Sequence, residues 1–208
     1  MVINFASFVL LSFLLVILPG PDTVMVTKNT LGAGISAGSK TLLGICLALC
    51  IHTFIAVVGL SALIVHSSHL FALFKIIGAT YLLYLGVTSL LATRRKTQVE
   101  QEPNNSTSNK QASFRQGFLT DLLNPKVAVF FLTFLPQFVN PNESTLMPFI
   151  LLGATYIILT LLFMLGYILL LDKIHIFMKK ASTQKAIQAI SGVVLIIFSV
   201  KLAFEKAN

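Results

Sequence analysis

Long apolar runs separated by short polar stretches occupy almost the whole chain. Six such runs can be marked, at about residues 4–30, 41–65, 70–91, 114–139, 146–171 and 185–204. An α-helix needs roughly 20 mostly apolar residues to cross the hydrocarbon core of a bilayer, and each run is about that long. The pattern predicts an all-α integral membrane protein with six transmembrane helices.

Two of these runs are interrupted by proline. The first is interrupted at Pro19-Gly20-Pro21 and the fourth at Asn124-Pro125. Proline has no N–H group and clashes with the preceding helical turn, so we expect both helices to break. The first break lies in repeat 1 (about 1–92), and the second lies in repeat 2 (about 114–208). Three helices on each side of a linker (about 93–113) predict one membrane transport domain of two inverted three-helix repeats, the first helix of each repeat broken at proline.

The two breaks can be aligned with each other. When Pro21 is set against Pro125, the aligned pairs are Gly20 with Asn124, Asp22 with Lys126, and His52 with Tyr156. Inverted repeats with discontinuous helices in matching positions are typical of secondary transporters, whose binding sites lie at the breaks. We therefore place the candidate site at the two prolines.

Composition supports the membrane prediction. Hydrophobic residues make up 56% of the 208 residues and charged residues only 11%, against roughly 25% charged residues in an average soluble domain. A single soluble domain and a disordered chain are both excluded. The first run resembles a secretory signal, but no Lys or Arg precedes Lys28 and a proline cluster follows it, so we interpret it as a retained helix.

The charges are few and basic, with 15 Lys and Arg against 7 Asp and Glu. Most basic residues fall in the first, third and fifth connections, which is typical of cytoplasmic loops and not of a nucleic-acid surface. We expect a multi-pass protein of the bacterial inner (plasma) membrane, with the polar, flexible linker in the cytoplasm and both termini outside. Lys201 and Lys206 argue mildly against that orientation.

The first break predicts a binding site for a zwitterion. In hydrocarbon, open backbone persists only where protein or a water-filled cavity satisfies its polar groups. The helix that begins at Pro21 carries partial positive charge at its start, which suits a carboxylate. Asp22 then receives a substrate ammonium, carries a coupling proton or pairs with Lys126. The alternative is a plain proline kink with Asp22 as a helix cap.

The second break offers an amide and a cation. Asn124 precedes proline and is therefore pushed out of the helical conformation. Lys126 neutralises Asp22 or binds the substrate carboxylate, unless it extends to the cytoplasmic interface. Asp121 lies near that interface, and we interpret it as a residue at the start of a helix.

Two neighbouring segments carry further candidates. The four-residue spacing of Gly44, Ala48, His52 and Ala56 puts them on one helix face. His52 either bonds a neighbouring helix or faces the cavity as a proton-sensitive group. The fifth run carries one stripe that either lines the substrate path or packs: Gly153, Tyr156, Thr160, Met164 and Tyr167. In the third run, Gly78, Leu82 and Gly86 form a packing stripe with Tyr81 beside it.

We expect no metal, cofactor or catalytic group. Cys46 and Cys50 lie about 40° apart on one helix, and His52 is rotated about 120° from Cys46, so the three cannot converge on one ion. Cysteine here is interpreted as a small packing residue. The sequence contains no nucleotide-binding glycine loop and no hydrolase motif, which predicts that the chain is not an enzyme.

Three motifs in order resemble the lysine exporter and homoserine/threonine resistance (LysE/RhtB) family. They are Pro19-Gly20-Pro21-Asp22, then the stretch 78–86, and then Asn124-Pro125-Lys126 followed by 135–139. The resemblance implies a bacterial inner-membrane exporter of amino acids or close derivatives, coupled to the proton motive force and not to ATP. Homoserine, threonine or another neutral amino acid is favoured over lysine as substrate. A homodimer is left open.

Two other functions compete with export. Distant relatives of this architecture relay electrons through membrane cysteines, but such a relay would need a cysteine in each half, and both cysteines here lie in the first. A passive channel is the other alternative, and it would lack saturable, gradient-dependent export.

Overall fold

The computed structural model describes residues 2–60, 68–93, 110–140, 144–171 and 180–204. These residues are helical, apart from short connections and one isolated bridge between Val2 and Val139. The helices are α1 (Phe5–Ile17), α2 (Pro21–Ala33), α3 (Ile35–Ile55) with a π-helical turn η1 (Ala56–Leu60), α5 (Ser68–Ala92), α6 (Lys110–Leu122), α7 (Pro125–Val129), η2 (Phe130–Phe134), η3 (Leu135–Phe138), α8 (Leu146–Leu169) and α10 (Ala181–Phe204). The predicted all-helical class is confirmed.

The described helices are long and apolar enough for a multi-pass membrane protein. Three single helices qualify as spans: Ile35–Gly59, Leu146–Leu169 and Ser182–Val200. Two broken pairs qualify when each is taken as one span, which gives up to five in the described residues. The third predicted run corresponds to α5, whose apolar stretch Ile76–Ala92 is shorter.

Both predicted breaks are present. The chain bends by 50° between α1 and α2, and by 47° between residues 112–122 and 125–138. Leu18 and Asn124, which both precede a proline, have extended ψ angles of 116° and 109°. Pro21 and Pro125 each occupy the first position of the next helix, where no N–H is needed.

Two helix starts differ from the sequence prediction. The second run was expected to begin near residue 41, but α3 begins at Ile35, because Gly34 has a φ of +83° and lets the chain reverse directly out of α2. The linker was expected to reach residue 113, but α6 begins at Lys110. The polar residues just before the apolar run are compatible with a helix, so α6 begins one turn earlier than the run. Residues 94–109 of the linker lie outside the described part.

The close approach of α3 to α6 is fixed by glycines. The backbone of α6 at Phe114 lies where a side chain at Gly44 would start, and the backbone of α3 at Thr41 lies where one at Gly117 would start. Ala48, His52 and Ala56 continue the same buried face. The predicted seam is confirmed, and its partner is the helix that leads into the second break.

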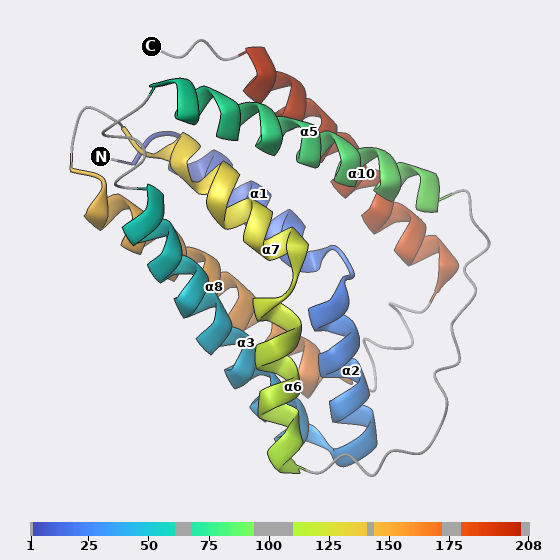
Figure 1. Cartoon of the computed structure of the whole chain (residues 1–208). Helices are drawn as coiled ribbons and strands as arrows, with labels where there is room; N and C mark the ends of the chain where they lie inside the picture. The colour runs from blue at the N-terminus through green and yellow to red at the C-terminus, as the bar shows by residue number, and fades with distance from the viewer. Residues whose placement is uncertain (1, 61–67, 94–109, 141–143, 172–179, 205–208) are drawn as a thin grey trace.

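Figure 1 shows how the other helices lie relative to this contact. Helices α5 and α10 run side by side along one flank, where a Cβ on Gly86 or on Gly192 would lie 2.9 Å from the carbonyl oxygen of the other. Ser199 adds a hydrogen bond across this pair, from its Oγ to the Ala79 carbonyl at 2.7 Å. Between this flank and α3 lie α1, which ends at the first break, and α7, which begins at the second. The fold thereby places both breaks near its centre.

The α3–α6 contact predicts a sharp response to one added methyl group. Gly44→Ala is expected to cost about 1–3 kcal/mol, because the opposing atoms belong to backbone and cannot move aside. Gly166→Ala is the control, since nothing outside its own helix lies within 4 Å of its Cβ position. Thermal unfolding of the purified proteins in detergent should show a lower midpoint for Gly44→Ala only. Equal midpoints would contradict the close approach.

Candidate functional site

The two helix breaks face each other and are joined by hydrogen bonds in both directions. Asn124 Nδ2, at the second break, donates to Asp22 Oδ2 at the first, at 2.8 Å. Lys126 Nζ donates to the carbonyl oxygens of Leu15 and Leu18, at 3.0 and 3.2 Å. The aligned residues Asp22 and Lys126 therefore each contact the opposite break.

The proline positions explain where Lys126 binds. In a continuous helix the Leu15 carbonyl would accept a hydrogen bond from residue 19, but residue 19 is proline and has no N–H. That orphaned carbonyl lies at the C-terminal end of α1, where the helix carries partial negative charge. The Lys126 ammonium satisfies it. Lys126 thus points into the protein and does not extend to the interface. A Cβ on Gly20 would lie 3.0 Å from the ammonium, so glycine leaves room for it.

The second break explains the position of His52 in the same way. Pro125 removes the N–H that would serve the carbonyl of Asp121, four residues earlier. That carbonyl accepts from the Asn124 backbone N–H at 2.9 Å and from His52 Nε2 at 3.3 Å. The His52 ring also lies 5.7 Å from the ring of Phe131. His52 thus bonds a neighbouring helix, as one of its two sequence interpretations proposed.

A polar pocket opens beside the two breaks. The space between its lining atoms and across its open mouth totals about 280 Å³, and the part wide enough for an occupant is about the size of one water molecule. The walls come from α1, α2, α3, α6, α7 and α8, and the lining residues are Val16, Asp22, Thr23, Leu49, Asp121, Lys126, Val127, Tyr156, Thr160 and Met164. Five of the predicted site residues belong to the pocket or its hydrogen bonds: Asp22, Asn124, Lys126, Tyr156 and Thr160. Gly20, Pro21 and Pro125 shape the breaks beside it.

Three buried oxygens in this pocket lack a hydrogen-bond donor within the described part of the chain. They are Asp22 Oδ1, Asp121 Oδ2 and Thr160 Oγ1, on side chains exposed by only 8%, 1% and 4%. Leaving such a group unsatisfied costs about 1–3 kcal/mol, and more when it is charged. A donor placed in the pocket, such as an ammonium or a proton shared by the two carboxyl groups, would serve these oxygens.

Asp121 is the site residue that the sequence interpretation missed. It is not at the start of a helix, as expected, but in the last turn of α6, which ends at Leu122. Its carboxyl group lies against that of Asp22, and both interact with the charge of Lys126. Its spacing of three residues from Asn124 was the available signal, because it puts an acid immediately before a break. The pocket therefore contains two carboxyl groups and one ammonium.

Part of the stripe on α8 lines the polar pocket, and part of it packs against other helices. Tyr156, Thr160 and Met164 line the polar pocket, and the Tyr156 ring lies 4.9 Å from the ring of Phe130. Gly153 packs against Thr53 of α3. At the other end of the stripe, the Tyr167 hydroxyl and Thr27 Oγ1 are 2.8 Å apart and hydrogen-bonded.

The cysteines lie apart from the pocket. Both are free thiols on α3; Cys46 is partly buried and Cys50 is exposed. Neither lines the polar pocket. Among the described residues, no group of three His, Cys, Asp or Glu side chains could hold a metal ion.

Comparisons with known proteins all point to one family of membrane proteins. The family model described as LysE type translocator matches residues 13–206. An uncharacterized membrane protein, YrhP, of Bacillus subtilis (strain 168) is 36% identical over 201 residues, covering 94% of this chain and 96% of the relative. A homoserine/homoserine lactone efflux protein of Salmonella typhi is 27% identical, covering 95% and 94%. A leucine efflux protein of Salmonella typhimurium is 28% identical, covering 97% and 95%. No solved structure matches. Because the family model covers nearly the whole chain, and with it both proline breaks, the chain belongs to the LysE type translocator family.

Proposed function

We propose that this chain is a secondary-active exporter of neutral amino acids or close derivatives across the bacterial plasma membrane, coupled to the proton motive force. The observation that carries the proposal is the pair of carboxyl groups facing a lysine where two broken helices meet. Relatives named as amino-acid efflux proteins support the direction and the substrate class. The proposed activity is transport and involves no enzymatic step.

The pocket matches the two charges of an amino acid. The substrate ammonium binds between Asp22 and Asp121, where the donor-free oxygens lie, with the Thr160 hydroxyl beside them. The substrate carboxylate binds the Lys126 ammonium. Charge-assisted hydrogen bonds are stronger than neutral ones, and pairing both substrate charges offsets the cost of removing them from water.

Charge balance suggests how export is coupled to protons. Two ionised carboxyl groups in contact repel each other, so the pair favours one added positive charge. Either a proton or the substrate ammonium can supply this positive charge, and the two therefore compete for the carboxyl pair. Release of the substrate outside and capture of a proton there would make the carrier an antiporter.

We further infer that the two halves are inverted repeats that move against each other. Two pairs of counterpart helices contact each other, α3 with α8 and α5 with α10, and α2 of the first half also contacts α6 of the second. In secondary transporters built this way, one repeat rocks against the other around a fixed site. Figure 1 shows the end of α2 and the starts of α3 and α6 gathered at one end of the molecule. These three helices carry the basic residues Lys28, Lys40 and Arg115. This grouping supports a cytoplasmic linker with both termini outside.

Asp22→Asn tests the substrate contact. Losing one buried charge partner is expected to lower gradient-driven uptake of labelled neutral amino acids into inside-out vesicles by about tenfold or more. Asp22→Glu, which keeps the charge, should retain part of the activity, and immunoblots should show equal protein in the membrane. Unchanged uptake by Asp22→Asn would remove Asp22 from the mechanism.

Asp121→Asn separates substrate binding from proton coupling. The variant keeps a polar side chain but removes one of the two carboxyl groups that contact the substrate ammonium, so exchange of labelled for unlabelled amino acid should fall by about tenfold but remain measurable, while accumulation driven by a pH gradient is lost altogether. Both measurements use the same vesicles. If accumulation and exchange both match the wild type, the carboxyl pair is not the coupling site.

The double variant Cys46→Ser/Cys50→Ser distinguishes export from a thiol relay. An exporter should keep its full transport rate, because neither thiol lines the polar pocket. A relay would lose all activity, since its electrons travel through the thiols. The test is amino-acid export from cells that produce the variant as their only copy.

A further inference from the structure

A hydrogen bond between two hydroxyl groups closes one end of the polar pocket. Thr23 of α2 and Met164 of α8 both line the pocket. About one turn farther along each helix, Thr27 Oγ1 and the Tyr167 hydroxyl are joined at 2.8 Å. Thr27 Oγ1 already donates its proton to the Thr23 carbonyl at 2.7 Å, so Tyr167 is the donor of the bond between the helices.

This closure lies at the end of the molecule where α6 follows the linker. Helix α8 ends at Leu169, and a Cβ on Gly38, in the first turn of α3, would lie 3.4 Å from Ile168 Cγ2. The end of α2 and the start of α6 lie at the same end (Figure 1). We call it the linker end. In the proposed orientation it faces the cytoplasm.

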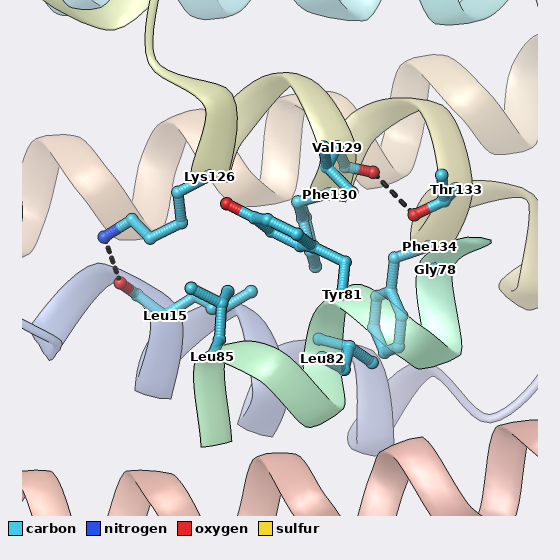
Figure 2. Close-up of a pocket in the computed structure, with 10 residues that line it drawn as sticks. All are labelled: Leu15, Gly78, Tyr81, Leu82, Leu85, Lys126, Val129, Phe130, Thr133 and Phe134. Atoms are coloured by element: carbon cyan, nitrogen blue, oxygen red, sulfur yellow. Dashed lines mark hydrogen bonds between the residues drawn. The ribbon is translucent and has the colours of Figure 1, made fainter. Parts of the chain in front are cut away.

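The opposite end of the polar pocket is closed by a series of aromatic rings. The ring centres of Tyr156 and Phe130 are 4.9 Å apart, and those of Phe130 and Phe134 are 5.2 Å apart. Phe138 continues the series, with its ring centre 5.0 Å from that of Phe134. Figure 2 shows Phe130 and Phe134 beyond Lys126, where the space that remains has room for about one water molecule. Four packed rings therefore block this end, whereas a pair of hydroxyls spans α2 and α8 at the linker end.

The helices around α8 are tied to one another at the linker end. Asn29 Nδ2 on α2 donates to Thr41 Oγ1 of α3 at 2.8 Å and to Gln116 Oε1 of α6 at 2.9 Å. Near its other end, α8 packs closely against α3, because a Cβ on Gly153 would overlap the side chain of Thr53. The end of α8 can therefore move away from α2 while its first turns stay in place and α2, α3 and α6 stay together.

We propose that the hydrogen bond between Tyr167 and Thr27 is the gate through which the exported amino acid enters the polar pocket. This inference deepens the proposed export function and rests on it. The free part of the closed pocket is about the size of one water molecule, so an amino acid enters only when the surrounding helices separate. The substrate of an exporter arrives from the cytoplasm, and the closure on that side must open in every cycle. Losing one ordinary hydrogen bond shifts an equilibrium by only about two- to tenfold, so thermal motion opens this gate repeatedly.

The experiment measures how fast a cysteine in the pocket reacts from each side of the membrane. Met164→Cys is introduced into the Cys46→Ser/Cys50→Ser background and treated with a membrane-impermeant maleimide. Inside-out vesicles expose the cytoplasmic face to the reagent, and spheroplasts expose the outer face. Tyr167→Phe removes only the hydroxyl and should raise the reaction rate about three- to tenfold in inside-out vesicles, with no change in spheroplasts.

Two further variants distinguish a gate from ordinary helix packing. Thr27→Val removes the acceptor with little change of shape and should raise the rate by a similar factor, which keeps the test decisive if Tyr167→Phe does not fold. Because both substitutions remove the same bond, combining them should give no further increase. Ser199→Ala is the matched control: it removes a hydrogen bond between α10 and α5, away from the polar pocket, and should leave the rate unchanged.

The proposed gate is overturned if either folded gate variant keeps the parent's rate, if the rate rises equally from both faces, or if the two effects multiply in the double variant. Amino-acid uptake is measured separately in the same vesicles. Absence of uptake by the wild type contradicts the proposed export function, even where the maleimide reaction shows an opening at the linker end.

Discussion

The structure depends on how a membrane-embedded chain satisfies the backbone groups that proline leaves without partners. Pro19 and Pro125 each orphan the carbonyl four residues earlier, on Leu15 and Asp121. The hydrocarbon core contains no water that could donate a hydrogen bond to these carbonyls, so other groups of the protein must donate it. Lys126 serves the first carbonyl, and His52 with the Asn124 backbone serves the second. Each break is therefore stable only in the presence of other helices, and the polar groups that stabilise the two breaks gather in one place.

Asn124 shows how closely the two breaks are coupled. Its Oδ1 accepts from the backbone N–H of Lys126 at 3.1 Å, which caps its own helix, while its Nδ2 donates to Asp22 across the gap. An aspartate in place of Asn124 would have no N–H to donate to Asp22, and a serine side chain would be too short to reach Asp22. The polar groups that close the breaks also leave two carboxyl groups and one ammonium beside a pocket, which is the charge pattern that a zwitterion complements. Stabilising the breaks and recognising a substrate are in this account two uses of the same side chains.

Local rules predicted the breaks, and tertiary contacts decided the rest. Proline acts on its own neighbours, so both interruptions and the helix starts at Pro21 and Pro125 followed from the sequence alone. Asp121 was misplaced because its role depends on α6 starting at Lys110 and ending beside Asp22, which no local pattern encodes. The destination of Lys126 depends on the end of α1, more than a hundred residues away. The glycine seam of α3 was predicted from its spacing, but its partner, α6, was not.

A ligand series can test directly whether the pocket binds both charges of an amino acid. Purified protein in detergent should be stabilised against heat by L-leucine or L-alanine at millimolar concentration. The amine that lacks the carboxylate and the acid that lacks the ammonium should each give little or no stabilisation, because each leaves Lys126 or the carboxyl pair unmatched. Equal stabilisation by the amino acid and by either single-charge analogue would contradict a site built from two facing breaks.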